Sequence, residues 1–354
     1  MKKILPICLC FFLITGCVEP LDLDGIVSGT PQLVVDGLIT DQAEPYQVRL
    51  TYSATNLLSY QDEEISGAEV YVTDAEGERY EMYETGSGIY QSDPAEFQGV
   101  TGRTYQLHIR MPDGKTYASI PERMPASVPI DSIYARHENR PYLSSLGTAL
   151  DEWGMQFYVS GGSGQKRAGY YQWIYTETYE FAAPLLHPNP LFNAPTCYRT
   201  FRATRGVNVA SSEALQEDRI IGQPLTFATK RNYKLQRRYS LLVTQYALNE
   251  RAYNFWNSIR NQAEDGGSVF APPPSPIPGN LYNVNDDNEQ VLGLFQVSGV
   301  SQQRFFLRRS EVPNSPGGPP GGFSECVEGA LEIPETCYDC SLLPNVSTDR
   351  PSYW

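Results

Sequence analysis

Residues 104–120 read Thr104-Tyr-Gln-Leu-His-Ile-Arg-Met-Pro-Asp-Gly-Lys-Thr-Tyr-Ala-Ser-Ile120, and this stretch decides the fold class. Its first half alternates apolar and polar residues from Tyr105 to Met111, which is the period of a strand buried on one face. Pro112-Asp113-Gly114 then favours a tight turn, because glycine adopts positive φ without a steric clash. The stretch therefore predicts an antiparallel β-hairpin.

Similar β-rich runs precede this hairpin and are separated from one another by clusters of Gly, Pro, Asp and Asn. They cover residues 32–39, 46–52 and 68–73. Several short strands at this spacing are typical of an antiparallel sandwich. We therefore expect a β-sandwich of immunoglobulin or transthyretin type over residues 31–125.

Pro121, Pro125 and Pro129 mark a predicted domain boundary, after which a second, larger β-rich domain occupies residues 130–354. A polar segment without clear periodicity, residues 136–152, interrupts its strands. The run 238–248 is the most apolar and is predicted to be central in a sheet. The strands expected in this domain are 131–135, 155–159, 170–181, 238–248, 293–298 and 304–308.

One helix is predicted directly after residue 248. Asn249 is a preferred N-cap residue, and Glu250 favours the positive end of the helix dipole. Apolar residues follow at helical spacing, and Gly266-Gly267 end the helix. We expect this stripe to pack on a sheet rather than to hold a ligand. The whole fold is thus predicted to be all-β with one main helix.

The charge of the chain excludes one class of partner. The 354 residues carry 27 Lys plus Arg against 41 Asp plus Glu, a formal net charge of -14. Binding to a phosphate backbone needs a positive surface, so we expect no nucleic-acid partner.

The first residues predict an exported, lipid-anchored protein. Two lysines precede an uncharged apolar run over residues 4–15, which is too short to span a bilayer but suits a signal peptide. Ile14-Thr15-Gly16-Cys17 resembles the bacterial lipobox, so residues 1–16 are predicted to be cleaved and Cys17 to carry the lipid. The alternative is an ordinary secretory peptide. Loss of Lys2 and Lys3 changes the net charge from -14 to -16.

Residues 17–30 are acidic and are predicted to form a tether. Acidic residues after a lipidated cysteine resemble the surface-export signals of Bacteroidetes lipoproteins, and the surface and periplasmic faces of the outer membrane both stay open. No later window has the length and hydrophobicity of a membrane span.

The search for catalytic and metal motifs leaves no candidate residue. His108, His137 and His187 are scattered without the spacing of a zinc hydrolase. Gly161-Gly-Ser-Gly164 lacks the spacing of a serine-hydrolase motif and is interpreted as a flexible loop. Asn283-Val-Asn-Asp-Asp287 resembles a calcium loop without its later glycine and glutamate, and a solvated turn is the preferred interpretation. We expect no catalytic residue, no metal and no cofactor.

The cysteines predict two disulfides. Cys8 and Cys10 leave with the signal peptide and Cys17 is lipidated, so four cysteines stay in the folded body. An even number in an exported protein favours disulfides, with three possible connectivities; a zinc site or a redox motif is the alternative. Our preferred pairing joins Cys326 to one tail cysteine and Cys197 to the other. The four candidates are Cys197, Cys326, Cys337 and Cys340.

The chain resembles the DUF4249 lipoproteins of Bacteroidetes outer membranes. The residues that carry the resemblance begin with Cys17, Leu33-Val-Val-Asp-Gly-Leu-Ile-Thr40 and Tyr46-Gln-Val-Arg-Leu50, and continue through the motifs at 102–109, 239–246, 279–283 and 291–295. The tail motifs Cys337-Tyr-Asp-Cys340 and Arg350-Pro-Ser-Tyr-Trp354 also match, whereas residues 315–322 depart as a local insertion. The resemblance implies a β-sandwich followed by a second β-rich domain, and a TonB-dependent outer-membrane transporter as partner.

These features together predict a non-catalytic accessory or cargo-capturing partner of such a transporter, held at the outer membrane by lipid. Two alternatives stay open. One is a surface glycan or peptide hydrolase, which a cluster of convergent carboxylates or histidines would support. The other is an adhesive module, which a flat exposed face rich in the chain's 24 tyrosines would support.

Overall fold

The structure is a computed structural model. It describes residues 31–53, 63–144, 147–203, 207–265, 275–313, 325–326 and 332–354. The predicted signal peptide, Cys17 and the tether therefore lie outside the described residues, as do Gly266-Gly267 and the insertion at 315–322. The described chain is rich in strands and contains one α-helix, which confirms the predicted all-β class.

The predicted hairpin is present in the first domain, between β4 on one side and β17 on the other. Strand β7 (Thr104–Arg110) pairs with β8 (Thr116–Ser119) in antiparallel register, with Ile109 opposite Tyr117. Gly114 has φ of +91° and its amide donates to the Met111 carbonyl at 2.9 Å, so the turn needs glycine at this position. Tyr105, Leu107 and Ile109 are fully buried on one face, as the alternation indicates.

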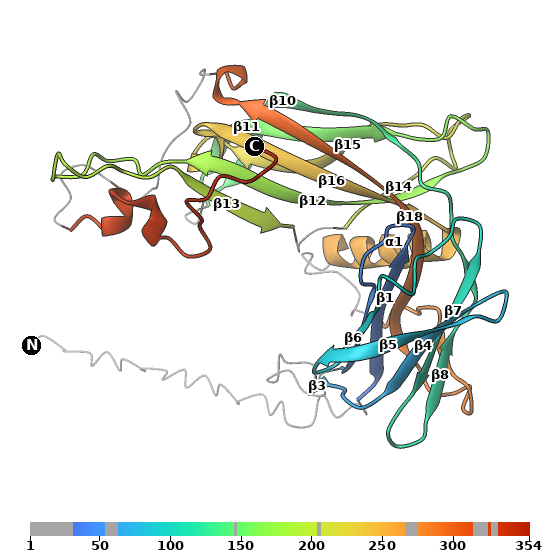
Figure 1. The fold of residues 1–354 in the computed structure, drawn as a ribbon. Coiled ribbons are helices and arrows are strands. Elements are labelled where there is room, and N and C mark those ends of the chain that lie inside the picture. Colours follow the sequence, from blue (N-terminus) through green and yellow to red (C-terminus); the bar gives the residue numbers. More distant parts are fainter. Residues whose placement is uncertain are drawn as a thin grey trace, which may run out of the picture.

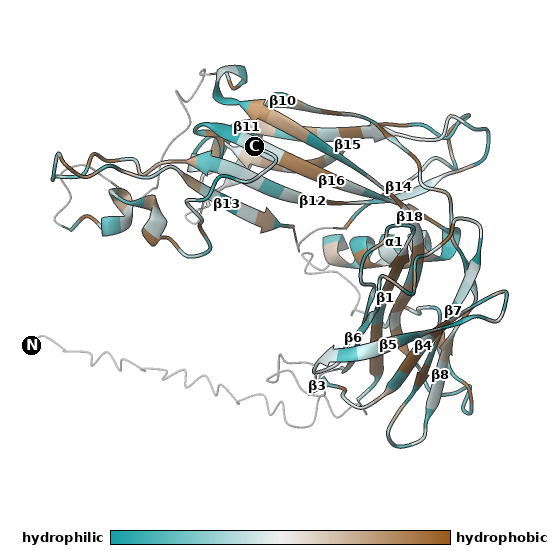
Figure 2. Cartoon of the chain, in the orientation of Figure 1, coloured by the Kyte–Doolittle hydropathy of each residue, from teal (hydrophilic) through white to brown (hydrophobic). Residues whose placement is uncertain are grey.

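The first domain wraps its strands around a single core. Antiparallel pairing joins the strands in the order β1-β2-β6-β5-β4-β7-β8, with short β3 and β9 at the margins. Figure 2 shows strongly hydrophobic residues along β1 and the neighbouring part of β18. The remaining strands of this group are β1 (Leu33–Thr40), β2 (Gln47–Tyr52), β3 (Glu63–Glu64), β4 (Glu69–Asp74), β5 (Arg79–Gly86), β6 (Ile89–Ser92) and β9 (Glu122–Arg123).

Two late segments of the chain return to complete this first domain. Strand β17 (Leu281–Asn283) pairs with β8, and the first part of β18 (Leu292–Arg308) pairs in parallel with β1. Leu281, Phe295 and Val297 accordingly belong to the first core. The predicted division at residues 125–130 therefore needs correction, because these long-range pairings place part of the segment 130–354 in the first domain.

The second domain consists of two packed sheets. One has the order β13-β12-β16-β18, with β14 also paired to β12, and the other has the order β10-β11-β15. Strand β16 lies between β12 and β18, which confirms its predicted central place. The strands are β10 (Ile130–Leu143), β11 (Ala149–Gly161), β12 (Tyr170–Phe181), β13 (Cys197–Arg202), β14 (Asn208–Ser211), β15 (Ile220–Thr229) and β16 (Arg238–Leu248).

Two expectations for the second domain were wrong. The polar segment 136–152 forms most of a long antiparallel pair, β10 with β11, because cross-strand contacts such as the stacked rings of His137 and Trp153 replace an apolar face. The two strands expected at 293–298 and 304–308 are one continuous strand, β18. Its second part pairs with β16 from Gly299 to Arg308, so β18 belongs to both domains.

Helix α1 (Glu250–Asp265) lies at the junction of the two domains and contacts β12, β14, β16 and β18. The Asn249 side chain accepts a hydrogen bond from the Ala252 amide at 2.8 Å, which confirms the predicted N-cap. Ala252 is buried, and Phe255 and Trp256 pack partly buried against the same small core. The apolar stripe therefore packs on the sheet, as predicted.

Four short 3-10 helices complete the described elements. They are η1 (Tyr233–Leu235), η2 (Arg309–Glu311), η3 (Glu335–Cys337) and η4 (Cys340–Leu342). No helix in the described part of the chain is long and apolar enough to cross a membrane.

Candidate binding cleft at the domain junction

A cleft of about 600 Å³ lies where the two domains meet. We call it the junction cleft. One side comes from the first domain, the opposite side from the loop that leads into β12, and the start of α1 closes it. Its lining residues are Thr101, Gly102, Arg123, Met124, Pro125, Ala126, Val128, Ser163, Gln165, Arg167, Ala168, Gly169, Tyr170, Tyr171, Asp218, Ala247, Leu248, Asn249 and Glu250.

Asp218 is the buried hub of this cleft, with only 3% of its surface exposed. Its Oδ2 accepts hydrogen bonds from the Ser163 amide at 2.9 Å, the Ser163 hydroxyl at 2.6 Å and the Tyr171 hydroxyl at 2.6 Å. Its Oδ1 accepts from the Ser212 hydroxyl at 2.8 Å. Four donors from three separate segments therefore fix one carboxylate.

This network corrects the interpretation of Gly161-Gly-Ser-Gly164 as a flexible loop. Ser163 is bonded to Asp218 through both its amide and its hydroxyl, and the Gly164 amide donates to the Asp218 carbonyl at 2.9 Å. Gly162 must be glycine, since an added Cβ would lie 2.2 Å from that carbonyl oxygen and its φ is +153°. Hydrogen bonds therefore hold this loop in place, and it forms one wall of the cleft.

Hydrogen bonds fix the protonation states of Asp218 and Tyr171. Burial disfavours the charged form of Asp218, but the hydrogen bonds from Ser163, Tyr171 and Ser212 outweigh it and hold the pKa below its ordinary value. Burial and the bond to Asp218 raise the pKa of Tyr171 far above its ordinary value. At neutral pH the carboxylate therefore accepts and the phenol donates.

A second hollow, of about 530 Å³, adjoins the start of α1. Buried Glu122 lies on its wall and accepts hydrogen bonds from Asn249 at 2.5 Å, Asn280 at 3.0 Å and Arg251 at 3.0 Å. Burial raises the pKa of Glu122 although these partners oppose the shift. Asn249 thus caps the helix with one side-chain atom and binds Glu122 with the other.

Charged side chains also line the junction cleft. Arg123 is fixed by donating through Nε to the Gly102 carbonyl at 2.9 Å. Arg167 and Glu250 are exposed lining residues. The four donors to Asp218 are neutral groups, so they stabilise its charge without removing it. The charged lining residues are therefore two arginines and two carboxylates, and the cleft offers a ligand both cationic donors and anionic acceptors.

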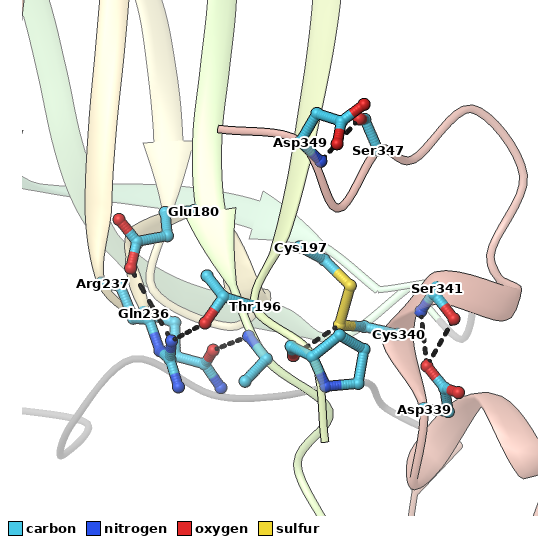
Figure 3. Close-up of a disulfide and its surroundings, with 12 residues drawn as sticks. Glu180, Thr196, Cys197, Gln236, Arg237, Asp339, Cys340, Ser341, Ser347 and Asp349 are labelled. Atoms are coloured by element: carbon cyan, nitrogen blue, oxygen red, sulfur yellow. Dashed lines mark hydrogen bonds and ion pairs between the residues drawn. A yellow bond between two sulfur atoms is a disulfide. The ribbon is translucent and has the colours of Figure 1, made fainter. Parts of the chain in front are cut away.

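The four predicted cysteines form the two disulfides of the preferred pairing. Cys197 is bonded to Cys340 with an S–S distance of 2.00 Å, and Cys326 to Cys337 with 1.99 Å. Figure 3 shows the first of these bridges joining the start of β13 to the tail. The tail helices η3 and η4 lie at the far end of the second domain from α1, so the bridges hold the tail and do not shape the cleft (Figure 1).

The histidines and the calcium-like segment do not gather into a site. The His108 ring stacks on Tyr71 at 4.8 Å between ring centroids and shares a hydrogen bond with Thr73. Asn283 accepts from the Asn285 amide and donates to Glu289, so its side chain closes a turn. Within the described ranges, no group of three or more His, Cys, Asp or Glu residues is placed to hold a metal ion.

Sequence reasoning missed the junction cleft and its hub. Asp218 has no motif around it, and its partners Ser163, Tyr171 and Ser212 come from separate parts of the second domain. Burial explains part of the abundance of tyrosine, because nine tyrosines of the described residues are buried. Only the Gly-Ser-Gly loop, an unusual cluster of small residues before a long strand, gave a signal that could have marked the site.

Comparison with known proteins identifies the family. The DUF4249 family, described as a domain of unknown function, matches residues 18–304. The chain therefore belongs to the DUF4249 family, as its sequence resemblance implied. The match spans both domains and all lining residues of the cleft, and it ends before the disulfide-bonded tail. No curated protein matches the chain.

Proposed function

We propose, from the membership of the DUF4249 family, that this chain is a lipid-anchored outer-membrane protein of the Bacteroidetes that captures cargo for a TonB-dependent transporter. Its role is non-catalytic. The lipid on Cys17 raises the local concentration of the body beside the transporter, and the junction cleft binds the cargo.

The junction cleft is the observation that carries this proposal. It has the volume of a small-molecule or short-peptide site, and its polar groups are fixed before any ligand arrives. Asp218 is saturated with hydrogen bonds and Arg123 is held by a backbone carbonyl, so binding requires little reordering. Arg123 and Arg167 offer guanidinium donors to the acceptor groups of a cargo, beside the carboxylates of Asp218 and Glu250.

The cysteine pairing supports the lipid anchor. Cys197, Cys326, Cys337 and Cys340 are all in disulfides. Since Cys8 and Cys10 belong to the predicted signal peptide, Cys17 is the one cysteine of the predicted mature chain that is left for acylation.

Affinity purification tests the partner. The tagged full chain, extracted from native membranes in mild detergent, is expected to recover a TonB-dependent barrel, and an unrelated lipoprotein with the same tag serves as control. Repeated absence of the barrel, or its equal recovery with the control, would contradict the partnership.

A cleft-filling variant tests cargo capture separately. Ala168→Trp places a large ring among the lining residues, whereas Lys166→Trp adds the same ring two positions away on an exposed residue that does not line the cleft. Mass spectrometry of small molecules and peptides released from each purified protein is expected to show bound cargo for the native chain and Lys166→Trp, and its loss for Ala168→Trp. Equal cargo on both variants would place binding elsewhere.

A further inference from the structure

The connection between β12 and β13 exposes two leucines almost completely. Leu186 is 95% exposed and Leu191 is 91% exposed, the highest values among the large hydrophobic side chains of the described residues. The next highest is Ile221, at 77%. We call residues 182–196 the apolar loop. Figure 1 shows this connection extending beyond the end of the sheet, beside the short helices of the tail.

The apolar loop carries no charged residue. Its sequence is Ala-Ala-Pro-Leu-Leu-His-Pro-Asn-Pro-Leu-Phe-Asn-Ala-Pro-Thr, in a chain of which 19% of the residues are charged. A charged side chain strongly opposes transfer of a segment out of water, and so does a loose, unsatisfied backbone. Because the apolar loop has no charged side chain, the first of these two costs does not arise.

Internal hydrogen bonds fix the shape of the loop tip. The Asn189 amide donates to His187 Nδ1 at 3.0 Å, and the Asn189 side chain accepts from the Leu191 amide at 3.0 Å. The Phe192 amide donates to the Asn189 carbonyl at 3.1 Å, and the rings of His187 and Phe192 stack with centroids 4.3 Å apart. The tip is therefore ordered with both leucines left outside its own packing.

The tail braces the base of the loop. The Leu185 amide donates to the Cys337 carbonyl at 3.0 Å, and Tyr338 meets the His187 ring edge-on at 5.8 Å. The Cys197–Cys340 bridge then ties this tail to the start of β13, directly after the loop. A loop held in this way loses little conformational entropy when its tip is buried by something else.

We propose that the apolar loop inserts Leu186 and Leu191 into the apolar layer of the lipid bilayer that holds the acyl chains of Cys17. This inference rests on the lipid anchor of the proposed function. A bilayer can bury two leucines on a narrow tip without any broad contact surface. A stable complex with a protein partner, in contrast, usually buries about 800 Å² on each side. Glu335 and Asp339, on the tail near the loop base, stay in water and limit the depth.

The consequence is a defined orientation. Acyl chains on a tether fix the position of the body but not its rotation, and a second contact with the membrane reduces that freedom. Tyr170 of the junction cleft begins β12, and the apolar loop follows the other end of the same strand at Phe181, so insertion of the loop directs the cleft away from that contact.

Single added cysteines test the insertion in the full acylated chain. Leu186→Cys and Leu191→Cys each provide the one free thiol, because the four body cysteines are paired and Cys17 is acylated. The thiol is labelled with an environment-sensitive fluorophore, and the protein is reconstituted in phosphatidylcholine vesicles. Ile221→Cys, at an exposed position of strand β15, is the matched control.

The expected result is a blue shift of the label at both loop positions, with quenching by spin-labelled lipid, and neither effect at Ile221→Cys. Leu186→Asp introduced beside a label at residue 191 is expected to reduce the inserted fraction at least tenfold. A label that stays in water in vesicles would overturn the proposal, as would one that is shielded only when outer-membrane proteins are added. Mass spectrometry of the N-terminus separates this failure from failure of the anchor, since an unacylated chain would contradict the proposed function itself.

Discussion

The hydroxyl of Tyr171 lies 2.6 Å from Oδ2 of Asp218 and joins strand β12 to the segment before β15. Tyr171 belongs to the sheet that contains β12, Asp218 lies in the loop that leads into the other sheet at β15, and both line the junction cleft. This bond connects the core of the domain to the wall of the candidate site, so the shape of the cleft and the stability of the domain depend on the same contact.

Removing the hydroxyl is expected to destabilise the protein. Tyr171→Phe leaves the buried Asp218 carboxylate with one donor fewer, which costs about 1–3 kcal/mol of unfolding free energy. Urea denaturation followed by circular dichroism measures the change. The neighbouring Tyr170→Phe is the control, because no hydrogen bond of its hydroxyl forms part of the hub; an equal loss in both variants would contradict the role of the contact.

The stability that Asp218 contributes is expected to disappear in acid. Its folded pKa lies below the ordinary value, so the folded state favours the carboxylate and the contribution is complete above the unfolded pKa of about 3.9. As pH falls through the lower folded pKa, the carboxyl is protonated in both states and the contribution is lost. The difference in unfolding free energy between the native chain and Asp218→Asn should therefore be largest at pH 7 and shrink below about pH 4. A constant difference from pH 7 to pH 3 would be inconsistent with this assignment.

The two disulfides are expected to differ in their effect on stability. Cys197–Cys340 closes a separation of 143 residues and Cys326–Cys337 one of 11. The chain-entropy relation gives about 5 kcal/mol for the first and about 3 kcal/mol for the second. Paired Cys→Ala variants, compared by denaturation without reductant, should show the larger loss for the long bridge. The opposite order would mean that native contacts, rather than the unfolded chain, decide the effect.

Two lysines of the second domain are expected to respond in opposite directions when replaced by methionine. Lys230 is 5% exposed and its Nζ has no hydrogen-bond partner, so burial lowers its pKa and Lys230→Met should raise the unfolding free energy by about 1 kcal/mol. Lys234 Nζ lies 2.6 Å from buried Glu177, and Lys234→Met should lower the unfolding free energy by about 3 kcal/mol because it leaves that carboxylate uncompensated.

The expected increase in unfolding free energy for Lys230→Met can be checked by its dependence on pH. A lysine whose folded pKa is lowered opposes folding while it is protonated, and this penalty is relieved as pH rises through the folded pKa. The advantage of Lys230→Met over the native chain should therefore be smaller at pH 10 than at pH 7. An advantage that grows with pH would refute the interpretation of Lys230 as an unpaired buried cation.

Local patterns in the sequence determined the elements whose stability is local. The alternation from Tyr105 to Ile109 and the Asp113-Gly114 turn specified one hairpin, since both strands and the connection lie within 17 residues. Asn249 and the stripe that follows it specified the helix. The even number of body cysteines favoured two disulfides that join Cys326 to one tail cysteine and Cys197 to the other, and the structure decides that Cys197 pairs with Cys340 and Cys326 with Cys337.

Tertiary structure alone decided how distant segments meet. Strand β18 pairs in parallel with β1 across more than 250 residues of sequence. Nothing in the sequence of either strand indicates which strand it pairs with. The polar segment 136–152 forms strands because β10 and β11 pair with each other, although its own periodicity is weak. Asp218 is a hub for the same reason: a buried carboxylate is stable only where donors converge, and convergence of Ser163, Tyr171 and Ser212 is a property of the folded chain rather than of any one stretch of it.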